Sequence, residues 1–197
     1  ETLTVGWLDM QGDELAFVYD PEWRARPGAF PISLSMPLSE PRVGAARILP
    51  WLANLLPESH LTEIGQQIGV SSQDIPGLLD RIGRDTAGAL AIGLPRQGQD
   101  TFRPVESEAA LARIINELPQ RPFLVGEEGV SMSLAGAQDK LPVALVDGEI
   151  AIPIEGTPST HILKPDNPRL KGSVQNEALC MVLAELVGLD VAKVTTG

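Results

Sequence analysis

Cysteine and histidine are scarce in this chain of 197 residues, which has one cysteine, Cys180, and two histidines, His60 and His161. A single cysteine cannot form an internal disulfide, and three such residues are too few for the usual structural zinc site. The absence of a disulfide fits a reducing compartment, so we expect a cytoplasmic protein.

Long apolar runs are absent as well. No stretch approaches the roughly 18 to 20 apolar residues that a membrane span requires, and no signal-peptide pattern opens the chain. A membrane is therefore not expected among the partners. Because the chain starts with Glu1 and stops at Gly197, soon after a strand-like run, we expect it to be a piece of a longer protein.

Basic residues are too few for a nucleic-acid-binding chain. Lysine and arginine number 15 against 26 aspartates and glutamates, a net charge of −11. This balance argues against a broad DNA or RNA footprint made by this chain alone, because such binding needs clustered basic side chains, although it leaves room for a basic patch on one face. The hydrophobic content of 43% and the charged content of 21% are typical of a folded soluble protein.

Hydrophobic periodicity in the first half predicts a strand-rich unit with short helices. A Gly-centred turn at Gly12 predicts a hairpin, and Pro50 is expected in the first turn of its helix. The expected strands are 3–9, 14–19, a short one at 32–36, and 90–94, and the expected helices are 48–56, 60–68 and 73–82, the last with Ser72 as a possible N-cap.

The second half predicts four short strands and two helices. Helix 106–117 should end before Pro119, and the expected strands are 130–135, 141–146, 149–153 and 160–164. A helix at 174–187 carries an apolar face at helical spacing, with Ser173 as its N-cap and Gly188 just past its end. The residues of that face are Leu179, Val182, Leu183 and Leu186.

The predicted fold class is α+β. A β-rich N-terminal subdomain with short helices covers residues 1–100, and a helical linker covers 101–128. A small antiparallel sheet with one packed helix covers 129–197, and this part is similar to the start of a kinase N-lobe.

The most informative segment is the loop at 133–140, which follows one strand-like run and precedes another. Its centre holds only small residues, Ala135, Gly136 and Ala137, followed by Gln138, Asp139 and Lys140. A hairpin turn of this kind can bring its backbone N–H groups close to a phosphate, because no large side chain intervenes. An ordinary hairpin turn is the alternative interpretation, since the loop has a single glycine.

Two charged residues downstream extend this pattern. Lys164 ends a predicted strand and Glu177 lies in the first turn of the next helix, the order found in the N-terminal lobe of protein kinases. The alternatives are a surface lysine with a packed stem and a carboxylate that favours a helix N-terminus. His60 is interpreted as a solvated side chain, and Asp166 with Asn167 and Pro168 as a turn.

The full set of motifs resembles the HipA family of bacterial serine/threonine kinases, which act as toxins of toxin–antitoxin pairs. The resemblance covers nearly the whole chain. It rests on SLAGAQDKLP at 133–142, THILKP at 160–165, NEALC at 176–180, NLLPE at 54–58 and IGRDTAGA at 82–89.

This resemblance implies roles for individual residues. Ala135 to Lys140 would form the nucleotide-binding loop over the ATP phosphates, and Lys164 would contact ATP. Glu177 is the possible partner of that lysine, by analogy with the kinase ion pair. Ser133 matches the serine on which members of the family autophosphorylate, and Asp139 stands where the best-known relatives carry glutamate.

The catalytic aspartate and the Mg²⁺ ligands of such a kinase are expected in a C-terminal domain beyond residue 197. No catalytic or metal-binding residue is therefore assigned within this chain, which alone should be inactive. The resemblance implies ATP and Mg²⁺ as cofactors.

The partners that the resemblance implies are a HipB-like DNA-binding antitoxin and a protein substrate. The substrate known for the family is the aminoacyl-tRNA synthetase for glutamate, whose phosphorylation leads to dormancy and persistence. Operator DNA would be contacted only through the antitoxin complex. Two alternatives stay open: a non-catalytic binding module or split subunit that docks on a kinase core or antitoxin, and part of a sugar or other small-molecule kinase.

Overall fold

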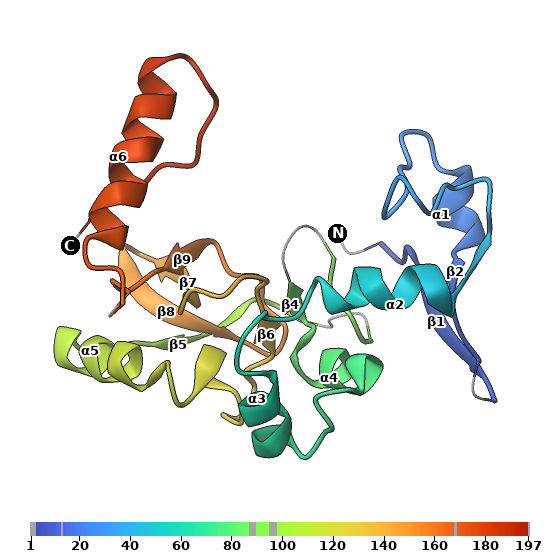
Figure 1. Cartoon of the computed structure of the whole chain (residues 1–197), viewed down its shortest axis with the longest axis horizontal. Helices are drawn as coiled ribbons and strands as arrows, with labels where there is room; N and C mark the ends of the chain where they lie inside the picture. The colour runs from blue at the N-terminus through green and yellow to red at the C-terminus, as the bar shows by residue number, and fades with distance from the viewer. Residues whose placement is uncertain (1–2, 13, 87–89, 95–97, 168, 197) are drawn as a thin grey trace.

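The computed structural model describes residues 3–12, 14–86, 90–94, 98–167 and 169–196. Strands and helices are mixed along the described chain, which confirms the α+β class (Figure 1). None of its described helices is long and apolar enough to cross a membrane. In chain order the elements are β1 Gly6–Gln11, β2 Glu14–Tyr19, α1 Pro21–Ala25, β3 Arg42–Gly44, α2 Ala45–Ala53, α3 Leu61–Ile68, α4 Ile75–Ile82, β4 Asp85–Thr86, β5 Thr101–Pro104, α5 Glu108–Glu117, the 3₁₀ helix η1 Pro122–Leu124, β6 Met132–Ser133, β7 Leu141–Val146, β8 Glu149–Ile154, β9 His161–Leu163 and α6 Ser173–Leu186.

An antiparallel sheet of order β1-β2-β3 opens the chain. The predicted hairpin is confirmed, with Gly6 opposite Tyr19 and Gln11 opposite Glu14. The segment 32–36, predicted as a strand, forms only an isolated bridge between Ser33 and Met36. Prolines on both sides of this segment remove the backbone donors that a longer ladder would need.

Three helices follow this sheet. The predictions for α3 and α4 are confirmed to within two residues, but α4 is capped by Asp74, whose side chain accepts a 3.0 Å hydrogen bond from the Gly77 backbone, and not by Ser72. Helix α2 begins at Ala45, so Pro50 lies inside the helix and not in its first turn as predicted. Burial of Ile48 and Leu52 in the core stabilises α2 despite the missing proline donor.

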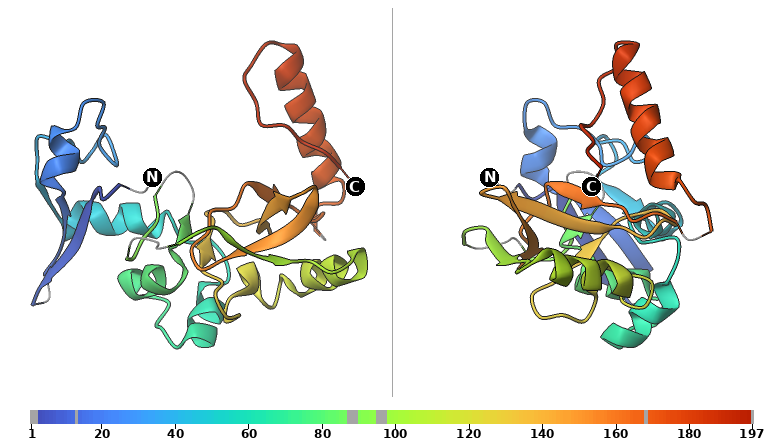
Figure 2. Two further views of the ribbon diagram at one scale, coloured as in Figure 1. Left: turned by 180° about the vertical axis from the view of Figure 1, so that it is seen from behind. Right: turned by 90° about the vertical axis from the view of Figure 1, so that its left-hand side faces the viewer.

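The second sheet is antiparallel, in the order β5-β8-β7-β9. Strand 141–146 forms as predicted, and β8 and β9 lie within a residue or so of their predicted bounds. The segment 101–128, expected as a helical linker, contains helix α5 and also strand β5, which pairs with β8. Figure 2 shows α5 running beside this sheet.

A short parallel pair, β4 with β6, joins the two halves of the chain. Leu90–Leu94 does not form the predicted strand, because the Thr86 hydroxyl donates to the Leu90 carbonyl at 2.6 Å and the Ile92 amide donates to the Gly83 carbonyl, so the chain folds back. The predicted hairpin around residues 133–140 is also wrong. Strand β6 pairs with β4 while β7 pairs with β8 and β9, so the loop connects two different sheets.

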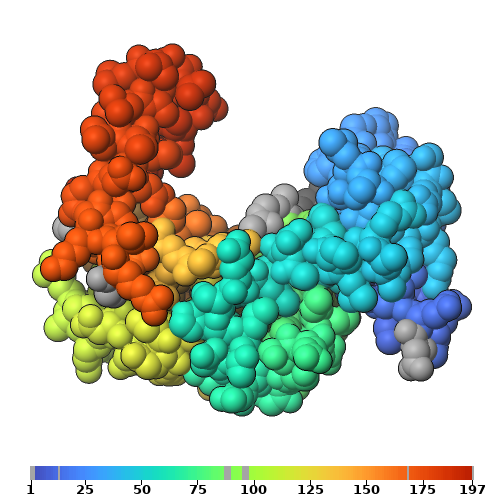
Figure 3. Space-filling view, viewed as in Figure 1, coloured from blue at the N-terminus to red at the C-terminus, as the bar shows by residue number. Residues whose placement is uncertain are grey.

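Helix α6 stands out from the body of the molecule, at the opposite end of its long axis from the N-terminal sheet (Figures 1 and 3). The helix ends as predicted, with Gly188 in a left-handed conformation whose amide donates to Glu185. It begins at Ser173 with Gly172 as the N-cap, where Ser173 was expected. Its apolar face was expected to pack on the sheet, but α6 has no buried residue, because no described element covers that face.

Candidate functional site

Ser133 lies at the start of the loop at 133–140 and is completely buried. Its hydroxyl donates a 2.8 Å hydrogen bond to the backbone carbonyl of Leu55, at the start of the segment that connects α2 to α3. The bond joins residues 78 positions apart, so only the tertiary fold creates it. The loop therefore leaves the core from a serine that is held by the N-terminal half.

Gly136, at the middle of the loop, has a backbone conformation that favours glycine. Its φ of +105° lies in the left-handed region, which side chains rarely adopt. A Cβ atom at this position would also lie 3.0 Å from the Lys140 ammonium nitrogen. The small-residue sequence thus permits a close approach between the loop and its own lysine.

Lys140 is buried beneath the loop. Its Nζ donates a 2.8 Å hydrogen bond to the Ala135 carbonyl, which closes the loop on itself. Burial lowers the pKa of the Lys140 ammonium and the positive charge of Lys164 lowers it further, whereas Glu58 and Asp139 act in the opposite direction. Two lysines therefore lie close enough to repel each other at this loop.

Lys164 follows β9 directly, and its ammonium forms an ion pair with the Glu177 carboxylate on α6. The Gln138 side chain donates to the Pro165 carbonyl at 3.5 Å, which ties the loop to the end of that strand. The structure thus brings together the loop, the lysine and the glutamate that the sequence singled out. A backbone without bulky side chains and two cations is an arrangement that suits an anionic group such as phosphate.

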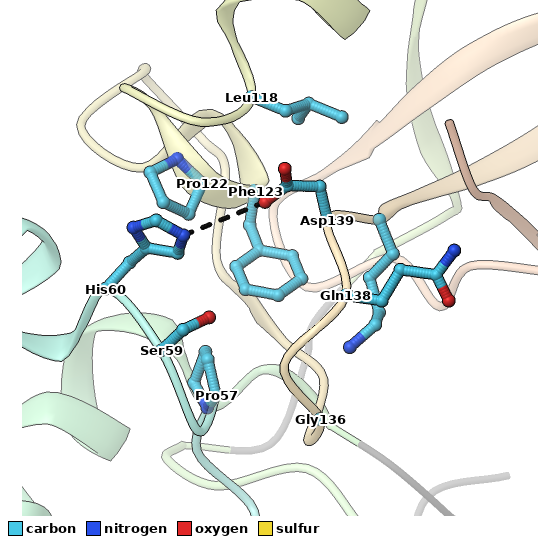
Figure 4. Close-up of a pocket in the computed structure, with 10 residues that line it drawn as sticks. Pro57, Ser59, His60, Leu118, Pro122, Phe123, Gly136, Gln138 and Asp139 are labelled. Atoms are coloured by element: carbon cyan, nitrogen blue, oxygen red, sulfur yellow. Dashed lines mark ion pairs between the residues drawn. The ribbon is translucent and has the colours of Figure 1, made fainter. Parts of the chain in front are cut away.

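His60 is the residue that sequence reasoning missed. Its Nε2 lies 3.7 Å from an Asp139 carboxylate oxygen, and both side chains are about seven-tenths shielded from solvent (Figure 4). His60, interpreted from the sequence as a solvated side chain, is therefore only partly solvated. No local pattern could have found this pair, because the two residues are far apart in the sequence.

His60 and Asp139 border a small pocket together with Phe123 (Figure 4). Its volume is about 10 Å³, room for roughly one water molecule. The loop therefore packs closely against the N-terminal half on this side, and this pocket itself does not accommodate a nucleotide.

Asp166 serves the turn before α6. One of its carboxylate oxygens accepts from the Ser173 hydroxyl at 2.7 Å and the other from the Gly172 amide. These hydrogen bonds, that of Ser173 first, lower the pKa of Asp166. The predicted turn is confirmed for Asp166 and Asn167, while Pro168 lies outside the described residues. Within the described ranges, no group of three or more His, Cys, Asp or Glu side chains could hold a metal ion.

Comparison with known proteins agrees with the family resemblance seen in the sequence motifs. The family model of the HipA N-terminal domain matches residues 1–93, and that of the HipA-like C-terminal domain matches residues 132–196. A putative kinase, Y4mE of Sinorhizobium fredii, is 41% identical over 94% of this chain and 46% of its own length. The serine/threonine-protein kinase toxin HipA of Shewanella oneidensis is 33% identical over 98% of this chain and 44% of its own length.

A solved structure agrees with these matches. The complex of Shewanella oneidensis HipA, HipB and operator DNA contains a chain that superposes with a TM-score of 0.76 at 32% identity. The match covers 98% of this chain and 45% of that one, so this chain spans about half the length of the relatives it matches.

The sheet, its small-residue loop and the lysine–glutamate ion pair define an α+β protein with a kinase N-lobe-like part. The two family matches and the solved relative identify its family: the chain belongs to the HipA family.

Proposed function

We propose that this chain is the nucleotide-binding, N-terminal part of an ATP-dependent serine/threonine kinase that acts as a toxin. The observation that carries the proposal is the ion pair between Lys164 and Glu177 beside the loop at 133–140. In protein kinases a lysine held by a helix glutamate contacts the nucleotide phosphates. The relatives named as kinases support the same activity.

The residues of the loop fit a triphosphate. Gly136 has no side chain to obstruct a close approach, and the lysines at 140 and 164 supply positive charge. ATP would supply the phosphoryl group that is transferred. The Mg²⁺ ligands and the catalytic aspartate would come from the part of the relatives that this chain does not span.

Ser133 is the proposed site of autophosphorylation. Because its side chain is completely buried and bonded to Leu55, the loop must leave the core before the hydroxyl can react. A phosphate adds about two negative charges and three acceptor oxygens, which the buried position cannot accommodate. Phosphorylation would therefore keep the loop out of place and switch the kinase off.

The proposed partners are a HipB-like antitoxin and a protein substrate. The solved relative was captured with HipB and operator DNA, and the net charge of −11 favours DNA contact through the antitoxin and not through this chain. The proposed substrate is an aminoacyl-tRNA synthetase, that for glutamate, on the strength of the family resemblance.

Substitution of Lys164 by alanine in the full-length protein tests the proposal. We expect autophosphorylation of Ser133 to fall by about 10²-fold or more, because a preorganised charge is lost. Phosphopeptide mass spectrometry measures it, and Lys193→Ala, which removes an exposed lysine of the C-terminal segment, is the control. Unchanged phosphorylation in Lys164→Ala would refute the role of Lys164.

The chain of 197 residues alone should show no turnover and at most weak binding of Mg-ATP in calorimetry. Turnover by this chain would contradict the proposal. A full-length protein that binds no nucleotide but binds the antitoxin would instead support the binding-module alternative.

A further inference from the structure

Residues 55–60, called the clamp segment below, connect α2 to α3 and contact the loop at both of its ends. At the first end the Leu55 carbonyl accepts the hydrogen bond from the buried Ser133 hydroxyl at 2.8 Å. At the other end the His60 imidazole lies 3.7 Å from the Asp139 carboxylate (Figure 4). The loop is therefore held from outside at both ends by one short stretch of chain.

The backbone of His60 is strained. Its φ of +65° is left-handed, a conformation that costs a residue with a side chain roughly 1 kcal/mol or more. Pro57, also in the clamp segment, is buried. Such strain persists where surrounding contacts over-determine the backbone, and here the strained residue carries the side chain that meets Asp139.

The segment of Phe123, which lines the pocket opposite His60, also has a left-handed backbone. Phe123 and Leu124 are consecutive residues with φ of +55°, both buried, and Phe123 lies beside the imidazole and the loop (Figure 4). The His60–Asp139 pair is thus partly desolvated between two rigid walls. When the imidazole is protonated the contact is an ion pair, and partial burial strengthens such a pair relative to one that is fully exposed.

The charges around the loop are complementary to those of the clamp segment. Glu58 stabilises the charged form of the buried Lys140 ammonium. The clamp segment therefore offers an acidic group to the loop lysine and an imidazole to the loop aspartate, in addition to the backbone acceptor for Ser133.

We propose that His60 is a positioning residue, and that the clamp segment holds the loop in its closed conformation before any ligand arrives. The identity of the ligand that the loop binds rests on the proposed function above. The contacts between the clamp segment and the loop do not depend on that function. A loop that is already ordered loses less conformational entropy when a ligand binds. The N-terminal half of the chain would thereby control a binding loop that belongs to the second half.

Amide hydrogen exchange of residues 134–140, measured on this chain without nucleotide, tests the clamp. His60→Asn removes the imidazole but keeps a residue type that tolerates the left-handed backbone. We expect protection of the loop amides to fall about twofold to fivefold, as for loss of a partly exposed ion pair. The matched control is His161→Asn on β9, an exposed histidine that forms a hydrogen bond with neighbouring Thr160; it should leave loop protection unchanged.

A charge exchange separates this role from a merely structural one. His60→Glu should repel Asp139 and reduce loop protection further, and the double variant His60→Glu/Asp139→Lys should restore it. Protection of the β7 and β8 amides reports whether the fold is retained. If a single variant loosens the whole sheet, the double variant still decides the question. Restored protection of the loop amides supports the clamp, and continued loss of that protection overturns it.

Loop protection in His60→Asn equal to that of the His161→Asn control would also overturn the proposal. The measurement uses no nucleotide. A chain whose loop is clamped, in a full-length protein that binds no ATP, would therefore refute the proposed function while leaving the clamp intact.

Discussion

At the scale of single residues, two buried hydroxyl groups, those of Ser133 and Tyr19, join distant segments of the chain. Tyr19 is the clearest case in the N-terminal sheet. Its buried hydroxyl donates to the Met36 carbonyl at 2.6 Å and accepts from the Ile32 amide at 3.0 Å. Through these two bonds strand β2 fixes the proline-rich segment that forms no strand of its own.

Burial raises the pKa of the Tyr19 phenol above its ordinary value, against a smaller opposite effect of the hydrogen bond from Ile32. The folded state therefore favours the protonated phenol. Its contribution to stability is fully present below the unfolded pKa of about 10 and is lost as the pH rises through the higher folded pKa. Because Tyr19 is the only tyrosine, absorbance at 295 nm follows it directly. We expect a midpoint above 10 for the folded chain and a lower midpoint in urea; equal midpoints would contradict this.

Tyr19→Phe should lower the free energy of unfolding by about 1–3 kcal/mol at pH 7, because two backbone groups lose a buried partner. Urea denaturation followed by circular dichroism measures the change. Trp7→Phe, at an exposed aromatic side chain of β1, should stay within about 0.5 kcal/mol. A Tyr19→Phe variant as stable as this control would show that the two hydrogen bonds contribute nothing.

At the scale of elements, α6 and α4 show the difference between an amphipathic pattern and a buried face. Both helices have apolar residues at helical spacing. The side chain of Leu78 in α4 is completely buried, whereas Leu186 in α6 is 76% exposed. The pattern alone therefore predicts a helix but not which surface covers it.

The same substitution in the two helices should have unequal effects. Leu78→Ala should destabilise the chain by about 2–5 kcal/mol, because it leaves a cavity in the core. Leu186→Ala should change the free energy of unfolding by no more than about 0.5 kcal/mol. Urea denaturation of both variants measures the difference, and equal losses would show that α6 packs its apolar face in solution.

Elements that depend on local pattern alone were predicted correctly. Helices α3 and α5 and strand β7 formed close to their expected residues, because hydrophobic period and flanking turn residues act over a few positions. Pro50 inside α2 and the missing strand at 90–94 were not predictable in this way. In both places contacts with other segments outweighed the local preference.

At the scale of the whole molecule, one hydrophobic core runs through both halves of the chain. It contains Phe17 and Val43 of the first sheet, Leu56 of the clamp segment, and Val143 and Ile152 of the second sheet. Leu118 and Phe123, from the segment expected to be only a linker, belong to the same core.

A continuous core predicts a single cooperative unfolding transition for the two sheets. All three tryptophans lie within the first 51 residues, so their fluorescence reports the N-terminal half. Amide exchange in β7 and β8 reports the second half. We expect the two probes to give the same urea midpoint, and a separate transition of the second sheet would contradict a shared core.

The sequence by itself determined the α+β class, most of the helices and strands, and the residues of the candidate site from Ala135 to Lys140, with Lys164 and Glu177. These depend on local period, on small residues in a turn and on the order of motifs along the chain. Only the tertiary structure decided that β6 pairs with β4, that Ser133 is buried against Leu55, and that His60 meets Asp139. The physical reason is distance along the chain: such contacts join residues tens of positions apart, and the packing of the whole core selects them.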